Sequence, residues 1–239
     1  MKKILYLFCL VLTLLLKPAM ASEAEYPLDS APDRTSDVQA LQRGAKLFIN
    51  HCLNCHGASM VRYNRLQDLG LDKEQIETNL LYTADKIGEM MQVSMPVKMA
   101  KKWFGAAPPD LSLIARARGT DWLYTYLRTF YRDPSRETGW NNLVFPNVGM
   151  PHVLWEMSGE KILVSEHGHL PAKLELVNAG TMTQDQYDSA VADLVSFMAW
   201  MAEPKRNERV RLGFGVMAFL LVFTLLAWRL NKAYWKDIH

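Results

Sequence analysis

The chain has 239 residues, and its 27 Lys and Arg against 25 Asp and Glu give a formal net charge of +2. This total is misleading, because residues 22–204 carry 23 acidic and 17 basic side chains, a net charge of −6. Such an acidic segment does not fit nucleic-acid binding, which needs a basic surface, and it is long enough for one domain with its own core.

The N-terminus has the pattern of a secretory signal peptide. A basic start precedes an apolar run from Ile4 to Leu16, and Ala19-Met20-Ala21 then supplies small residues for cleavage. The run is shorter than the ~20 residues that a spanning helix needs. We predict that residues 1–21 are removed on export, with a retained anchor as the alternative.

The first predicted helix is capped by Ser36 or Asp37 and runs to about Asn50. Gly44 permits another helix to approach closely. Apolar residues at helical spacing form one face, namely Val38, Leu41, Ala45, Phe48 and Ile49.

The stretch HCLNCHG, residues 51–57, follows this helix directly. Zinc would need a second ligand pair, for which His167 and His169 are the nearest candidates. A thioredoxin-like dithiol is expected at a strand-to-helix turn, and a disulfide this short would close too small a loop to stabilise much.

The remaining interpretation of the motif is covalent haem attachment. In the C-x-x-C-H pattern each thiol adds to one haem vinyl group, and the histidine becomes an axial ligand of the iron. Loss of Cys9 with the signal leaves two cysteines in the mature chain. We therefore predict one haem c, held by Cys52, Cys55 and His56.

Methionine is the usual sixth ligand when such a haem transfers electrons. Met95 and Met150 each precede a proline in a non-helical context, and His152 is a third candidate. Spacing alone does not separate them.

The remaining elements indicate a mainly α domain with long loops. Thr183 and Gln186 form a capping-box pattern at the start of the clearest helix. The predicted elements are short helices within Leu66–Met95, helices over Leu111–Arg118 and Thr120–Tyr131, an irregular region over Asp133–Met157, a small strand pair within Ile162–Leu176, and a helix over Thr183–Ala202.

The C-terminus carries an uncharged apolar segment, Leu212–Trp228, bracketed by Arg211 and Arg229. We predict a basic juxtamembrane segment at 205–211, a transmembrane helix at 212–230 and a cytoplasmic tail at 231–239. Positive charge is nearly balanced across the helix. The signal peptide instead sets the orientation, with residues 22–204 in the periplasm and a single pass through the inner membrane.

Four segments together resemble the cytochrome c1 family, the haem subunits of quinol–cytochrome c reductase complexes, in its bacterial form. They are RGAKLFINHCLNCHG at 43–57, AAPPDLSLIARARG at 106–119, FPNVGMPHVLW at 145–155 and FMAWMAEPKRNERVRLGF at 197–214. The C-x-x-C-H motif alone would indicate any c-type haem, whereas the combination is far more specific.

The resemblance implies roles for matching positions. Met150 would be the sixth ligand, Arg118 would pair with a haem propionate, and Pro108 and Pro109 would line the pocket. The chain departs from many relatives in having Trp122 where they have tyrosine, and its 145–150 loop looks shorter than in mitochondrial relatives.

The resemblance also implies a function without catalysis by this chain alone. It would pass single electrons from a Rieske iron–sulfur subunit to a soluble cytochrome c, beside cytochrome b and membrane lipid, in a complex that is dimeric. The acidic excess over residues 137–203 would steer a basic cytochrome c. The alternatives are another anchored monohaem cytochrome, such as an oxidase subunit, and a membrane-anchored thiol–disulfide oxidoreductase.

Overall fold

The structure is a computed structural model that describes residues 26–93, 95–164 and 173–236. The predicted signal peptide and the His167–His169 pair therefore lie outside the described residues. The helical elements are α2 (Val38–Leu47), the π-helical turn η1 (Phe48–Cys52), the 3-10 helix η2 (Tyr63–Leu69), α3 (Lys73–Asn79), α4 (Val97–Phe104), α5 (Ile114–Arg118), α6 (Thr120–Arg128), α7 (Trp155–Ser158), α8 (Gln184–Ala202) and α9 (Arg206–Tyr234). The strands are β1 (Ala58–Arg62), β2 (Met90–Met91), β3 (Phe130–Arg132), β4 (Trp140–Asn142), β5 (Glu160–Val164) and β6 (Lys173–Asn178).

The first helix begins as its sequence predicts. Asp37, rather than Ser36, is the cap, since its carboxylate accepts hydrogen bonds from the backbone N–H groups of Gln39 and Ala40. The regular helix ends at Leu47, and a π-helical turn carries the chain on to Cys52. Val38 is exposed because it lies at the outer end of the otherwise buried apolar face.

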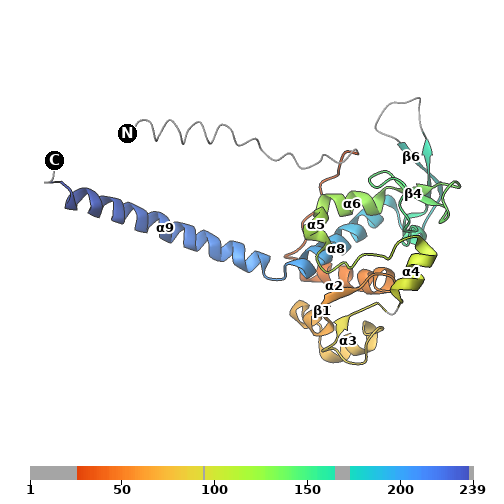
Figure 1. Cartoon of the computed structure of the whole chain (residues 1–239), viewed down its shortest axis with the longest axis horizontal. Coiled ribbons are helices and arrows are strands. Elements are labelled where there is room, and N and C mark those ends of the chain that lie inside the picture. The colour runs from red at the N-terminus through yellow and green to blue at the C-terminus, as the bar shows by residue number, and fades with distance from the viewer. Residues whose placement is uncertain (1–25, 94, 165–172, 237–239) are drawn as a thin grey trace.

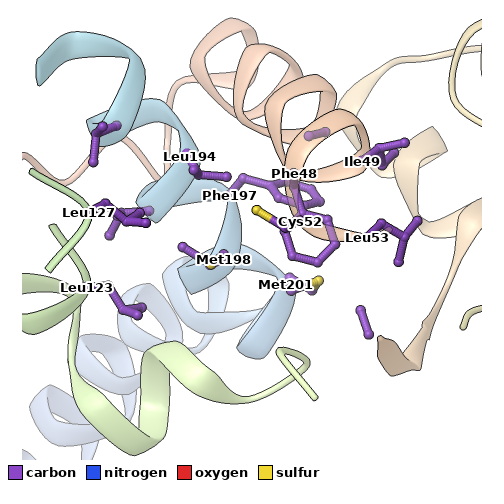
Figure 2. Packing of buried hydrophobic residues seen from close by; sticks show 14 of the residues in the cluster. Phe48, Ile49, Cys52, Leu53, Leu123, Leu127, Leu194, Phe197, Met198 and Met201 are labelled. Carbon is purple, nitrogen blue, oxygen red and sulfur yellow. The ribbon is translucent and has the colours of Figure 1, made fainter. Parts of the chain in front are cut away.

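The centre of the domain is the contact of α2 with α8 (Figures 1 and 2). A Cβ atom on Gly44 would lie 2.2 Å from the Asp193 carbonyl oxygen, so the helices touch at their backbones. The buried Asp193 carboxylate is paired with Arg34 and Arg43, each at 2.6 Å. Two cations thus compensate the charge that packing places in the core.

Apolar side chains fill the space around that contact. Figure 2 shows Phe48 and Cys52 facing Phe197 of α8, with Leu123 of α6 on the other side of α8. The capping box predicted for α8 is present, because the Thr183 hydroxyl and the Gln186 side chain each bond the other residue's backbone N–H.

The strands form two small sheets, in which all pairs are antiparallel except the parallel pair β3–β5. One contains β1 and β2, and the other has the order β4-β3-β5-β6. The predicted strand pair is confirmed as the antiparallel β5–β6 hairpin.

Two boundaries expected from the sequence are wrong. The helix expected to reach Tyr131 ends at Arg128, because Phe130–Arg132 pairs with β4 and β5. The region expected to be irregular contains β4 and α7. For β3 and β4, pairing between strands overrides the local pattern.

The helix α9 leaves the domain as a single rod (Figure 1). It is long and apolar enough to cross a membrane, and its large apolar side chains are exposed. The helix already begins at Arg206, so it includes most of the basic segment as well as the apolar one. Arg206 pairs with Asp33 and Arg209 with Glu203, both at 3.2 Å, where the rod meets the domain.

Candidate haem site

A cavity of about 360 Å³ lies between the cysteine motif, α6 and the loop before α7. All the site residues expected from the sequence line it, namely Cys52, Cys55, His56, Pro108, Pro109, Arg118 and Met150. Most of the other lining is apolar, including Leu123, Leu127 and Met198. The structure thus brings together segments that are widely separated along the chain.

The cysteine motif is a tight turn at the end of η1. The Cys52 carbonyl oxygen accepts hydrogen bonds from the N–H groups of Cys55, at 3.1 Å, and His56, at 2.8 Å. This turn places both thiols and the imidazole on one wall of the cavity. Both thiols are free.

The imidazole of His56 is held in one orientation. Its Nδ1 donates to the Pro109 carbonyl oxygen at 2.7 Å, which leaves Nε2 with a lone pair for a metal. Burial lowers the pKa of His56, opposed by the hydrogen bond to Pro109 and by the charge of Asp110, so the ring is neutral near pH 7.

The Pro109 carbonyl is itself fixed by the residues that follow it. The Asp110 carboxylate accepts from the N–H groups of Ser59, at 2.8 Å, and Ser112, at 2.9 Å. The Leu111 N–H donates to the Gly57 carbonyl at 2.7 Å. Asp110 was not among the site residues expected from the sequence, although the spacing of Asp110 and Ser112 is typical of an Asx turn.

Met150 lines the cavity, and its sulfur accepts a hydrogen bond from the Tyr126 hydroxyl at 3.3 Å. Tyr126 lies eight residues beyond Arg118, on the same side of the cavity. The four-residue spacing of Trp122 and Tyr126 within one predicted helix was the available signal for Tyr126, which was not among the residues expected from the sequence.

The two other candidates for the sixth ligand lie elsewhere. Among the described residues that line the cavity, neither Met95 nor His152 is present. His152 is buried, stacks on Phe130 at 4.8 Å between ring centroids and shares a 2.8 Å hydrogen bond with Ser158. Burial lowers its pKa to about 3, so it is a neutral core residue.

Arg118 lies at the edge of the cavity, and its side chain is exposed. Its guanidinium carbon is 5.1 Å from the centroid of the Trp122 ring, a cation–π distance. Trp122, the residue that departs from the family pattern, stacks on Tyr126 at 4.8 Å. Within the described part of the chain Arg118 forms no ion pair, so its guanidinium is available to a carboxylate.

The thiols do not have the character of a redox dithiol. Burial and the neighbouring Cys55 raise the pKa of Cys52 to about 12, and burial raises the pKa of Cys55. Thiol–disulfide oxidoreductases instead depend on a thiolate with a lowered pKa.

The donor set fits a haem. Two thiols and an oriented imidazole lie on one wall, a thioether lies on the same cavity, and a guanidinium is available for a propionate. These features, with the mainly helical fold and the C-x-x-C-H turn, define a c-type cytochrome.

Comparison with known proteins identifies the family of c-type cytochromes to which the chain is similar. The model of the Cytochrome C1 family matches residues 30–238. The chain is 48% identical to the "Ammonia monooxygenase gamma subunit" of Nitrosomonas europaea, over 96% of this chain and 97% of that one. It is 43% identical to "Cytochrome c1" of Allochromatium vinosum, over 95% and 96% of the two chains, and 29% identical to "Cytochrome b/c1" of Bradyrhizobium diazoefficiens, over 85% of this chain and 34% of that one.

The chain belongs to the cytochrome c1 family. It is therefore a membrane-anchored electron-transfer protein of a respiratory chain that carries one covalently bound haem c.

Proposed function

We propose that this protein receives single electrons from a Rieske iron–sulfur subunit and passes them to a soluble cytochrome c, as a subunit of a quinol–cytochrome c reductase complex. The observation that carries the proposal is the single cavity that gathers Cys52, Cys55, His56 and Met150. Haem c, when bound there, supplies a one-electron carrier.

The protein's own residues hold and tune that carrier. Cys52 and Cys55 would bind it covalently, and His56 and Met150 would hold its iron, with Pro109 and Tyr126 positioning those two side chains. Pro108 would complete the wall beside His56. Arg118 would pair with a propionate. The apolar walls exclude water and favour a raised potential.

Cytochrome b is the expected neighbour in the membrane. The relative from Bradyrhizobium diazoefficiens is named "Cytochrome b/c1", and this chain matches about a third of its length. That arrangement supports an assembly in which α9 packs beside cytochrome b and lipid, within a complex that is dimeric.

The orientation follows from the predicted signal peptide. The haem domain would lie in the periplasm, α9 would cross the inner membrane once, and the residues after it would be cytoplasmic. The acidic excess over residues 137–203 would attract a basic cytochrome c.

Purification in mild detergent tests the proposal. We expect the chain to co-purify with cytochrome b and a Rieske subunit, and to show a c-type band in the reduced pyridine haemochrome spectrum. Recovery with oxidase subunits would contradict the proposal. Recovery with other monooxygenase subunits would do so too, in line with the name of the Nitrosomonas relative.

A further inference from the structure

The helix α4 is an unusual part of the surface of this acidic domain. Its sequence is VKMAKKWF, and Ala100 is its one buried residue. The three lysines Lys98, Lys101 and Lys102 are exposed. Within the described residues they take part in no ion pair.

Large exposed apolar side chains flank these lysines along the helix. Trp103 is 53% exposed and Val97 is 61% exposed. Isolated exposed apolar residues are ordinary, but tryptophan is enriched among the residues that contribute most to protein binding. An ordinary solvated helix face would account for the lysines and not for Trp103.

The C-terminal end of α4 belongs to the wall of the haem site. Phe104, its last residue, lines the cavity. A Cβ atom on Gly149, next to Met150, would lie 2.9 Å from the Phe104 carbonyl oxygen, so α4 abuts the Met150 loop. A protein bound on α4 would therefore lie against the Met150 side of the cavity.

The described lining of the cavity contains no Asp or Glu side chain. Arg118 is the one Lys or Arg in that lining. The domain as a whole carries a net charge of −6 over residues 22–204. An acidic partner would thus be repelled by most of the domain and attracted to α4, which favours a single docking orientation.

The position of α4 argues against a lipid partner. A basic amphipathic helix with tryptophan also suits an anionic membrane surface. In Figure 1, however, α4 lies at the end of the domain remote from α9, the helix that enters the membrane.

We infer that α4 is the docking element for an electron-carrier protein with an acidic face, which contacts Lys98, Lys101, Lys102 and Trp103 beside the Met150 wall of the cavity. The inference rests on the proposed function. It adds a second docking surface, opposite in sign to the acidic region at residues 137–203.

Stopped-flow oxidation of the reduced holoprotein in its complex tests the inference. The oxidants are an acidic blue copper protein and a basic cytochrome c. In the triple variant K98E/K101E/K102E we expect the second-order rate with the acidic probe to fall about tenfold or more at low ionic strength and to approach the wild-type rate at high salt. The rate with the basic probe should not fall. Trp103→Ala should slow the acidic probe at every salt concentration, and Trp103→Phe should restore most of the rate.

The control is K86E/K173E/K205E, which makes the same change of net charge at three exposed lysines outside α4. If it slows the acidic probe as much as the α4 variant, net charge rather than docking is responsible, and the inference fails. The inference also fails if the rate of the α4 variant with the acidic probe stays within about twofold of the wild-type rate. It fails as well if the wild-type protein sediments with anionic vesicles, the α4 variant does not, and the electron-transfer rates of the two are equal. Haem content and midpoint potential, measured on every variant, keep a damaged site distinct from lost docking.

Failure of the proposed function would look different. A wild-type preparation without a c-type haem, or without cytochrome b and a Rieske subunit, would reject that proposal before α4 is tested.

Discussion

His56 and Met150 lie on the same cavity, but the protein holds them in different ways. His56 is fixed by a backbone carbonyl in a segment that Asp110 ties down. Met150 is contacted by one side-chain hydroxyl, that of Tyr126. A single substitution should therefore displace the Met150 side chain more easily than the His56 side chain.

Met150→Leu should leave haem attached and lower its midpoint potential by about 0.2 V, because thioether ligation raises the potential and axial ligands set it over a range of ≈ 0.8 V. A redox titration of the membrane-bound protein measures this. Met95→Leu is the control and should leave the potential unchanged. The reverse result would identify Met95 as the ligand.

Tyr126→Phe should lower the potential by about 20–40 mV. The hydroxyl draws electron density from the sulfur and so favours the reduced iron, and a weak hydrogen bond of less than about 1 kcal/mol corresponds to this shift at 59 mV per tenfold change. Tyr124→Phe, on the same helix but outside the described cavity lining, is the control. Equal shifts in the two variants would contradict a specific Tyr126–Met150 interaction.

His152 should make the folded domain sensitive to acid. Its pKa is lowered to about 3 in the folded state by burial and by Lys161 and Arg132, so between about pH 6.5 and 3 the unfolded chain binds a proton that the folded chain does not. This contribution to stability is present above about pH 6.5 and is lost at about 1.4 kcal/mol per pH unit as the pH falls.

The free energy of unfolding at about pH 6.5 and 5.5 tests this, because carboxylates with ordinary pKa values remain largely ionised over that interval. His152→Gln should flatten the pH dependence relative to wild type. An unchanged slope would mean that another group titrates.

At the scale of the elements, the packing of α2 on α8 determines where the haem motif lies. The helix α2 was predictable because its cap and apolar face are local features. Its contact with α8 depends on Gly44 meeting Asp193, and the sequence showed only that a close approach was permitted.

Gly44→Ala should destabilise the domain by about 1–3 kcal/mol, because the new methyl group would overlap the Asp193 carbonyl. Helix propensity alone predicts the opposite sign, a gain of about 1 kcal/mol. Gly88→Ala is the control, since a Cβ there meets nothing within 4 Å. The free energy of unfolding from chemical denaturation distinguishes destabilisation from stabilisation. A Gly44→Ala protein more stable than wild type would show that the two helices are not in backbone contact.

At the scale of the whole molecule, the domain and α9 are joined by few contacts. The arginines of the pairs Arg206–Asp33 and Arg209–Glu203 are both exposed, and exposed pairs contribute about 0–1 kcal/mol each. The folding of the domain should therefore not depend on the anchor.

A chain that ends at Pro204 should release the haem domain from the membrane fraction into the soluble fraction with an unchanged haemochrome spectrum. Fractionation followed by spectroscopy measures this. Loss of the haem protein from both fractions would mean that α9 is needed for folding or maturation.

The sequence by itself determined the features that depend on neighbouring residues. These include the thiols and histidine of the haem motif, the capping box of α8, and the apolar run within α9, because each follows from spacing within a few residues. Only the tertiary structure decided which of Met150, Met95 and His152 lies on the cavity, and that Tyr126 contacts Met150 while Asp110 fixes the segment that holds His56. Contacts between distant segments depend on how whole elements pack, and that packing free energy is not contained in any local pattern.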